Sequence, residues 1–216
     1  MVQRLVSPCD GSIGEKGLWV SFLLTLCLND TEFGLLPTFS AWAHVAMLHM
    51  YLVVARLRAC EPEVYEAWQA QLVDHFFHEA EKRMGVDHEI SSGMVRQRYL
   101  KDLFVQWRGL LLAYDEGVVK GDAVLASAVW RNLYKAREDV DVRLLAGVVS
   151  FMRRCMAEFD RMDDGQFMYM LQVLGSVDKI EGLKGDVLSD IAREELENID
   201  APPAKVEGTN AVPETA

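Results

Sequence analysis

Two neighbouring carboxylates, Asp115 and Glu116, stand between a tyrosine and a glycine in the stretch AYDEG, residues 113–117. Paired acids of this kind can serve as general acid and base, or can hold a metal ion. Either chemistry needs a nucleophile or further ligands, and the sequence has no GxSxG motif and no glycine-rich phosphate loop. A hydrogen bond or ion pair to a basic side chain is therefore favoured over catalysis. The basic residues considered for it are Arg108, Lys120 and Arg131.

Candidate metal ligands lie in the segment DHFFHEAEKR, residues 74–83, where His75, His78 and Glu79 share one face of a predicted helix. Helical bundles that hold two iron ions carry two ExxH motifs and two further glutamates. The sequence has no ExxH motif, and HxxHE differs from the HExxH motif of zinc proteases. The segment is therefore interpreted as a polar helix face, and a metal-dependent helical enzyme is the third of three hypotheses.

Five basic residues fall on the polar faces of two predicted helices. They are Arg98, Lys101 and Arg108, within about 80° of one another on a helix over 94–115, and Arg143 and Arg154 on a helix over 141–161. If the two faces adjoin, these residues form a basic patch that contacts phosphates or acidic partners. From sequence alone, an ordinary solvated surface is the favoured interpretation.

The net charge of −11 is concentrated near the C-terminus, where residues 176–216 hold ten acidic and four basic residues. The rest of the chain is nearly neutral, so the acidic balance does not exclude a local basic face. Half of the residues are hydrophobic and a quarter are charged, which is typical of a globular protein. The four cysteines are widely spaced without a CxxC pair, which argues against a disulfide framework or a zinc site.

Helical periodicity dominates residues 36–174, whereas the alternating pattern of strands is weak. We predict an all-α fold, a compact bundle of five to six helices. The predicted helices are 39–58, 61–84, 94–115, 122–135, 141–161 and 165–174. Thr38, Asp122 and Asp141 are predicted to cap three of them, and Gly117 is predicted to end the third helix.

Composition divides the chain into an N-terminal segment, 1–35, a helical domain, 36–175, and an acidic tail, 176–216. Within the tail, the spacing predicts an acidic amphipathic helix over 183–200, followed by disorder. The helix over 39–58 is apolar almost all round, which indicates either a buried helix or a membrane span, and its two histidines favour burial. A protein that binds membrane surfaces or lipids is the second hypothesis.

Several longer stretches resemble one known family. They include LLPTFSAWAHVAMLHMYLVVARLRA, YLKDLFVQWRG, AYDEG and LASAVWRN, and together they extend from Leu36 to Asp160. These stretches resemble the ubiquinol–cytochrome c chaperone family, and in particular its fungal branch. The family consists of mitochondrial assembly factors for cytochrome b of respiratory complex III. Residues 1–35 do not resemble the usual start of such proteins and contain no recognisable presequence.

The resemblance implies a chaperone rather than an enzyme, with no cofactor. It implies a heterodimer with a second small assembly factor, placed at the tunnel exit of the mitochondrial ribosome. There the pair would receive newly made cytochrome b and support its translation, on the matrix side of the inner membrane and with peripheral membrane association.

The resemblance also implies roles for two groups of residues. A recognition surface would consist of Tyr114, Asp115, Glu116, Gly117, Trp130 and Arg131. The basic patch of Arg98, Lys101, Arg108, Arg143 and Arg154 would face the ribosome. This assembly chaperone is the first hypothesis.

Overall fold

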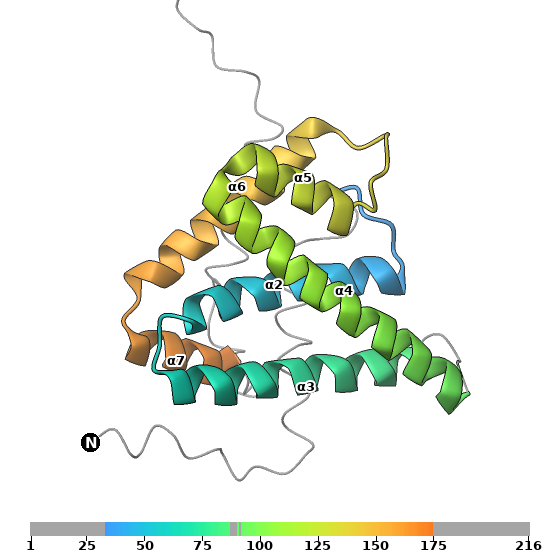
Figure 1. Cartoon of the computed structure of the whole chain (residues 1–216), viewed down its shortest axis with the longest axis horizontal. Coiled ribbons are helices and arrows are strands. Elements are labelled where there is room, and N and C mark those ends of the chain that lie inside the picture. The colour runs from blue at the N-terminus through green and yellow to red at the C-terminus, as the bar shows by residue number, and fades with distance from the viewer. Residues whose placement is uncertain (1–32, 87–89, 91, 175–216) are drawn as a thin grey trace, which may run out of the picture.

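The computed structural model describes residues 33–86, 90 and 92–174, and this part of the chain consists of six α-helices without a strand (Figure 1). The helices are α2 (Phe39–Leu57), α3 (Pro62–Val86), α4 (Gly93–Lys120), α5 (Asp122–Asn132), α6 (Val142–Arg161) and α7 (Asp164–Leu174). The all-α prediction is confirmed. The predictions for residues 1–32 and for the tail from residue 175 lie outside the described residues.

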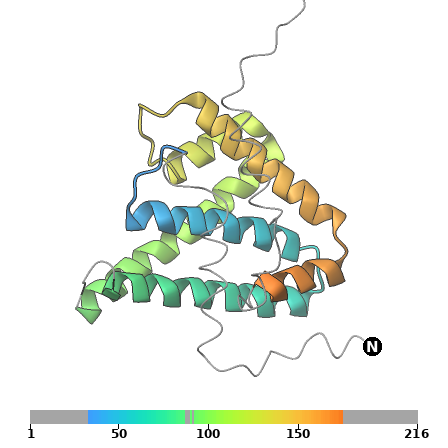
Figure 2. The same ribbon diagram turned by 180° about the vertical axis from the view of Figure 1, so that it is seen from behind.

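Helix α2 runs through the middle of the molecule and packs against α3, α4 and α6 (Figures 1 and 2). Neighbours on several sides explain why its sequence is apolar almost all round, since no face meets water over most of its length. The Thr38 side chain accepts a hydrogen bond from the Ala41 backbone amide at 3.2 Å, which confirms Thr38 as the N-cap. Among the described helices, none combines the length and the apolarity that a membrane crossing requires.

Two buried histidines of α2 are held neutral by their surroundings. His44 Nδ1 lies 2.7 Å from the Ser40 carbonyl oxygen, and His49 Nδ1 lies 2.8 Å from that of Val45. A carbonyl oxygen only accepts hydrogen bonds, so Nδ1 carries the proton in both rings. Burial lowers the pKa of each histidine to about 4, and the ammonium of Lys135 contributes to the shift at His44.

We expect His49 to make the stability of the protein depend on pH. Its pKa is 6.5 when exposed and about 4 when folded, so the unfolded chain binds the extra proton in this interval. Stability is therefore fully present above pH 6.5 and falls towards pH 4, by about 1.4 kcal/mol per pH unit and about 3 kcal/mol in all. Urea unfolding at pH 7.5, 6 and 5 measures this loss. His49→Leu should make the free energy of unfolding depend less steeply on pH. The same pH dependence in both proteins would show that His49 is not its source.

The junction of α4 and α5 differs from the prediction, because α4 continues through Gly117 to Lys120. Gly117 is buried in the interior of the helix, facing Leu125 of α5, and the chain turns instead at Gly121, whose φ is +109°. Gly121 is also the N-cap of α5, so the prediction that Asp122 is the cap was wrong. A glycine near a helix end is usually a stop signal, but here a close helix contact requires it.

The connection between α5 and α6 begins earlier than predicted, because α5 ends at Asn132. Lys135 and Ala136 both have a positive φ, near +55°, which is incompatible with a continued helix. The Trp130 indole donates a hydrogen bond to the Arg137 carbonyl at 2.7 Å and fixes this loop against α5. At the start of α6 the Asp141 side chain accepts a hydrogen bond from the Arg143 backbone amide at 2.9 Å, which confirms Asp141 as the N-cap.

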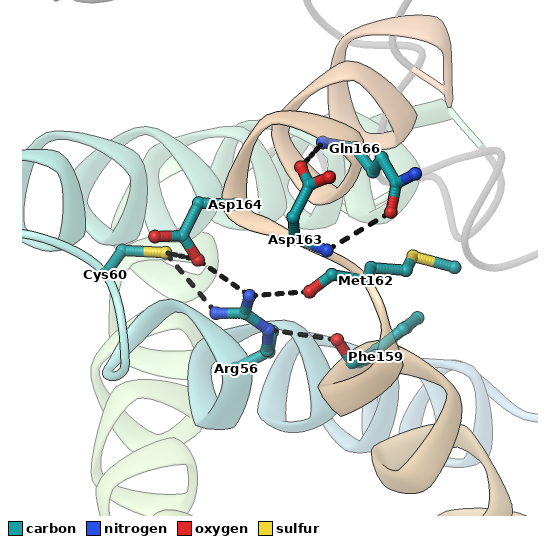
Figure 3. A network of polar contacts seen from close by, with 7 residues as sticks. All are labelled: Arg56, Cys60, Phe159, Met162, Asp163, Asp164 and Gln166. Carbon is teal, nitrogen blue, oxygen red and sulfur yellow. Dashed lines mark hydrogen bonds and ion pairs between the residues drawn. The ribbon is translucent and has the colours of Figure 1, made fainter.

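Arg56, near the end of α2, holds the connection between α6 and α7 (Figure 3). Its guanidinium donates to the carbonyl oxygens of Phe159 and Met162, both at 3.0 Å, and to the Asp164 carboxylate at 2.7 Å. It also lies over the ring of Phe167, 5.2 Å from the ring centre. Only 8% of the Arg56 side chain is exposed, so one buried cation joins the end of α6 to the beginning of α7.

Candidate functional site

Asp115 lies one turn before the end of α4 and connects this helix to α2. One of its oxygens accepts hydrogen bonds from Arg58 at 2.6 Å and from the Tyr51 hydroxyl at 3.2 Å. Burial and the neighbouring carboxylate raise the pKa of Tyr51, so its hydroxyl keeps its proton and acts as the donor. The carboxylate is therefore committed to joining two helices and is not poised for proton transfer.

Tyr114 packs beside this group but makes no polar contact. Its ring meets that of Tyr51 edge to face, with ring centres 5.2 Å apart. The Tyr114 side chain is fully buried, and its hydroxyl has no hydrogen-bond partner among the described residues. Burial raises the pKa of this phenol as well. Tyr114 thus contributes to the core, although the family resemblance implied that it belongs to a recognition surface.

The two tyrosines should respond in opposite ways when their hydroxyls are removed. Tyr51→Phe removes the hydrogen bond to Asp115 and should lower the free energy of unfolding by about 1 kcal/mol. Tyr114→Phe removes a buried hydroxyl without a partner and should leave stability unchanged or raise it by up to about 1 kcal/mol. Denaturant unfolding of both variants provides the comparison, and equal destabilisation would contradict the described hydrogen bonding.

Glu116 and Arg131 lie on the outer surface where α4 meets α5. Lys120 pairs with Glu116 at 2.6 Å and lowers the pKa of its carboxyl, and the charge of Arg131 adds a smaller effect. Both Glu116 and Arg131 are exposed, whereas Trp130 is half-buried with its indole nitrogen bonded to the loop. Glu116 and Arg131 are therefore the two predicted recognition residues whose charged groups are most open to solvent.

Gly117 lies beneath this surface and determines how closely α4 and α5 approach. A Cβ atom added to Gly117 would lie 2.6 Å from the Leu125 Cα and 2.9 Å from the Leu125 backbone nitrogen. Such distances are well inside van der Waals contact, so only glycine fits here. Of the six predicted recognition residues, Tyr114 and Gly117 therefore lie in the interior, and the other four reach the surface to different degrees.

The five basic residues occupy two helices on different sides of the molecule. Arg98, Lys101 and Arg108 are exposed on α4, which packs alongside α3. Helix α6, which carries Arg143 and Arg154, runs down the opposite side (Figures 1 and 2). The three residues of α4 form a local basic group by themselves.

Three residues that the sequence did not single out organise this region. Arg58 pairs with Asp115, and Tyr51 donates to it. From α6, Arg153 donates to the Asp122 carboxylate at 2.9 Å and to the Val118 carbonyl at 3.1 Å. Their partners lie between 31 and 64 residues away along the chain, so no local sequence pattern indicates the contacts.

In the predicted metal-like cluster on α3, Glu79 is engaged in ion pairs. Glu79 is buried, and its carboxylate lies 3.1 Å from Arg83 Nε and 3.7 Å from Lys82 Nζ. His78 is exposed and His75 is half-buried. In the part of the chain that the structure describes, no three histidine, cysteine or acidic side chains come together in a way that would hold a metal ion.

Comparison with known proteins gives one consistent result. Residues 31–170 match the sequence model of the family described as ubiquinol-cytochrome C chaperone. "Protein CBP3, mitochondrial" of Saccharomyces cerevisiae is 36% identical over 130 residues, which are 60% of this chain and 39% of that protein. "Ubiquinol-cytochrome c reductase complex assembly factor 1" of Drosophila melanogaster is 27% identical over 160 residues, 73% of this chain and 58% of that protein. No solved structure matches.

A further relative extends the comparison to vertebrates. The factor of the same name from Xenopus laevis is 27% identical over 129 residues, which are 58% of this chain and 61% of that protein. The chain therefore spans between about two fifths and three fifths of the length of these curated relatives. The family is one of chaperones and assembly factors, which confirms the prediction that the chain is not an enzyme. The chain belongs to the ubiquinol-cytochrome c chaperone family.

Proposed function

We propose that this protein is an assembly chaperone for cytochrome b of respiratory complex III. The family match over residues 31–170 carries the proposal, because it covers α2 to α6 completely and most of α7. The named relatives add support: one is designated mitochondrial, and others are assembly factors of the ubiquinol-cytochrome c reductase complex. We place the protein in mitochondria, on the matrix side of the inner membrane and peripherally associated with it.

The protein works with a small partner factor at the tunnel exit of the mitochondrial ribosome. There it receives newly made cytochrome b and supports the translation of cytochrome b. The exposed group of Arg98, Lys101 and Arg108 on α4 supports a contact with ribosomal phosphates, since clustered basic side chains neutralise them. The surface around Glu116 and Arg131 is the proposed contact for the small factor or the client protein, because its charged side chains are exposed.

A pull-down of the tagged full chain from gently solubilised mitochondria, followed by mass spectrometry, tests this function. Large-subunit ribosomal proteins, cytochrome b and one small assembly factor are the expected partners. Reversing Arg98, Lys101 and Arg108 to glutamate should remove the ribosomal proteins and retain the small factor. Arg161→Glu, an exposed residue at the end of α6, is the matched control and should retain both. Recovery of none of these partners by the unaltered chain would overturn the proposal.

A further inference from the structure

The solvent-facing side of α4 carries apolar residues that no described element covers. Met94, Val105 and Leu112 are 86%, 69% and 72% exposed. With the three basic residues Arg98, Lys101 and Arg108 they follow one line at alternating steps of four and three residues. We name the six residues, Met94, Arg98, Lys101, Val105, Arg108 and Leu112, the α4 stripe. Steps of four and three are the spacing by which one helix packs along another.

The α4 stripe is open to solvent and carries three positive charges. Figure 1 shows α4 crossing the front of the molecule with no other described helix in front of it. Within residues 33–86 and 92–174, none of the three bases makes an ion pair, in contrast to Arg58, Arg153 and Lys120 elsewhere. Apolar side chains interleaved with exposed cations favour an occupant that is itself amphipathic and acidic.

The chain itself contains a segment of this kind beyond the last described helix. In residues 186–200, Leu188, Ala192, Leu196 and Ile199 recur at steps of four, four and three. Six acidic residues and one basic residue accompany them. On a helix, Glu195 and Asp200 would lie within about 90° of the apolar row, one on each side of it. The segment therefore matches the α4 stripe in spacing and is opposite to it in charge.

We propose that residues 186–200 dock as a helix along the α4 stripe of the same chain. Fifteen helical residues extend about 22 Å, which fits within the stripe from Met94 to Leu112, about 27 Å long. The eleven residues 175–185 between α7 and the segment can span up to about 38 Å when extended, which is enough to pass around a bundle of helices spaced about 10 Å apart. The apolar rows face each other, and the acidic residues lie beside Arg98, Lys101 and Arg108.

Docking of this segment makes the α4 stripe a shared site. An acidic helix lying on Arg98, Lys101 and Arg108 excludes phosphates or any other acidic partner from the same residues. The tail would thus compete for the basic group and release it only to a partner that binds more strongly. Docking of the tail requires only the α4 stripe and residues 186–200, whichever acidic partner competes for the basic residues.

Zero-length cross-linking of the purified full chain tests the docking. A carbodiimide joins the Lys101 amine to a carboxylate only where the two are in contact, and mass spectrometry of a mixture of ¹⁴N and ¹⁵N chains separates links within a chain from links between chains. We expect links from Lys101 to Glu195 or Asp200 within one chain. They should weaken as the salt concentration rises from 0.05 to 0.5 M, because ions screen the exposed charges.

Charge reversals provide the controls. Arg98→Glu with Arg108→Glu should reduce the link at least fivefold. Adding Glu195→Lys with Asp200→Lys should restore the contact between the tail and α4. In this quadruple variant the contact is detected as a link between an introduced lysine of the tail and an introduced glutamate of α4. Arg161→Glu should leave the original link unchanged. Links found only between chains, or no link from Lys101 to the tail, would overturn the proposal. Exposed substitutions of this kind change stability little, and circular dichroism verifies that each variant is folded.

Discussion

Gly117→Ala is expected to destabilise the protein by about 3 kcal/mol, a large share of the roughly 5–15 kcal/mol that stabilises a typical domain. The added Cβ would lie 2.6 Å from the Leu125 Cα, and the nearest atoms include the backbone of α5. A flexible side chain could move aside, but backbone atoms within a helix move only if the whole helix shifts. Separating α4 from α5 would also disturb the core residues packed between them, and larger residues at position 117 should prevent folding.

Gly109→Ala is the matched control for this prediction. Gly109 lies on the same helix, is exposed, and has no atom within 4 Å of an added Cβ. Alanine there should stabilise the protein by about 1 kcal/mol, because it favours helix without a steric penalty. Denaturant unfolding of the two variants beside the unaltered chain measures both effects. If both substitutions changed stability in the same direction, the close contact of α4 and α5 at Gly117 would be wrong.

Arg56→Ala is expected to lower the free energy of unfolding by about 3 kcal/mol and to release α7 from the bundle. The substitution removes hydrogen bonds to the carbonyl oxygens of Phe159 and Met162 and the contact over the Phe167 ring. A buried cation that makes several such bonds contributes far more than an exposed one, since its loss removes a donor from the Met162 carbonyl and leaves the Phe159 carbonyl with only the 3.3 Å bond from the Met162 amide. Hydrogen exchange should accelerate most in residues 164–174.

Asp164→Asn tests whether the ion pair or the carbonyl contacts carry this effect. Asp164 accepts from Arg56 at 2.7 Å, but 63% of its side chain is exposed. An exposed partner is screened by water, so its neutralisation should cost no more than about 0.5–1 kcal/mol. We therefore expect Arg56→Ala to be several times more destabilising than Asp164→Asn. Equal effects would mean that the ion pair, and not the carbonyl contacts, secures α7.

The sequence predicted the helices well because each one has a continuous local signal. The apolar run of α2 and the caps Thr38 and Asp141 are contained within a few residues, and all three predictions are confirmed. The end of α4 was missed for a physical reason. Gly117 and Gly121 are both glycines near a helix end, and only the contact with Leu125 distinguishes a close approach from a stop signal.

The candidate site was less predictable because its organisation depends on distant residues. Both acids were correctly expected to pair with a base. Glu116 pairs with Lys120, one of the three bases considered, whereas the partner of Asp115 is Arg58, which was not among them. Tyr114 and Gly117 stand beside it in the motif yet serve the interior. A motif groups residues by position in the chain, whereas a helix turns successive residues by about 100° towards different surroundings.

The central position of α2 has a consequence for the synthesis of the protein. Helix α2 precedes its partner α6 by about 100 residues, and translation adds about 5–20 residues per second. The side of this apolar helix that α6 covers therefore waits about 5–20 seconds for its partner, while α3 and α4 become available earlier. During that interval the nascent chain exposes a hydrophobic segment of the kind that chaperones bind. This member of a chaperone family is therefore itself expected to need a chaperone during its own synthesis.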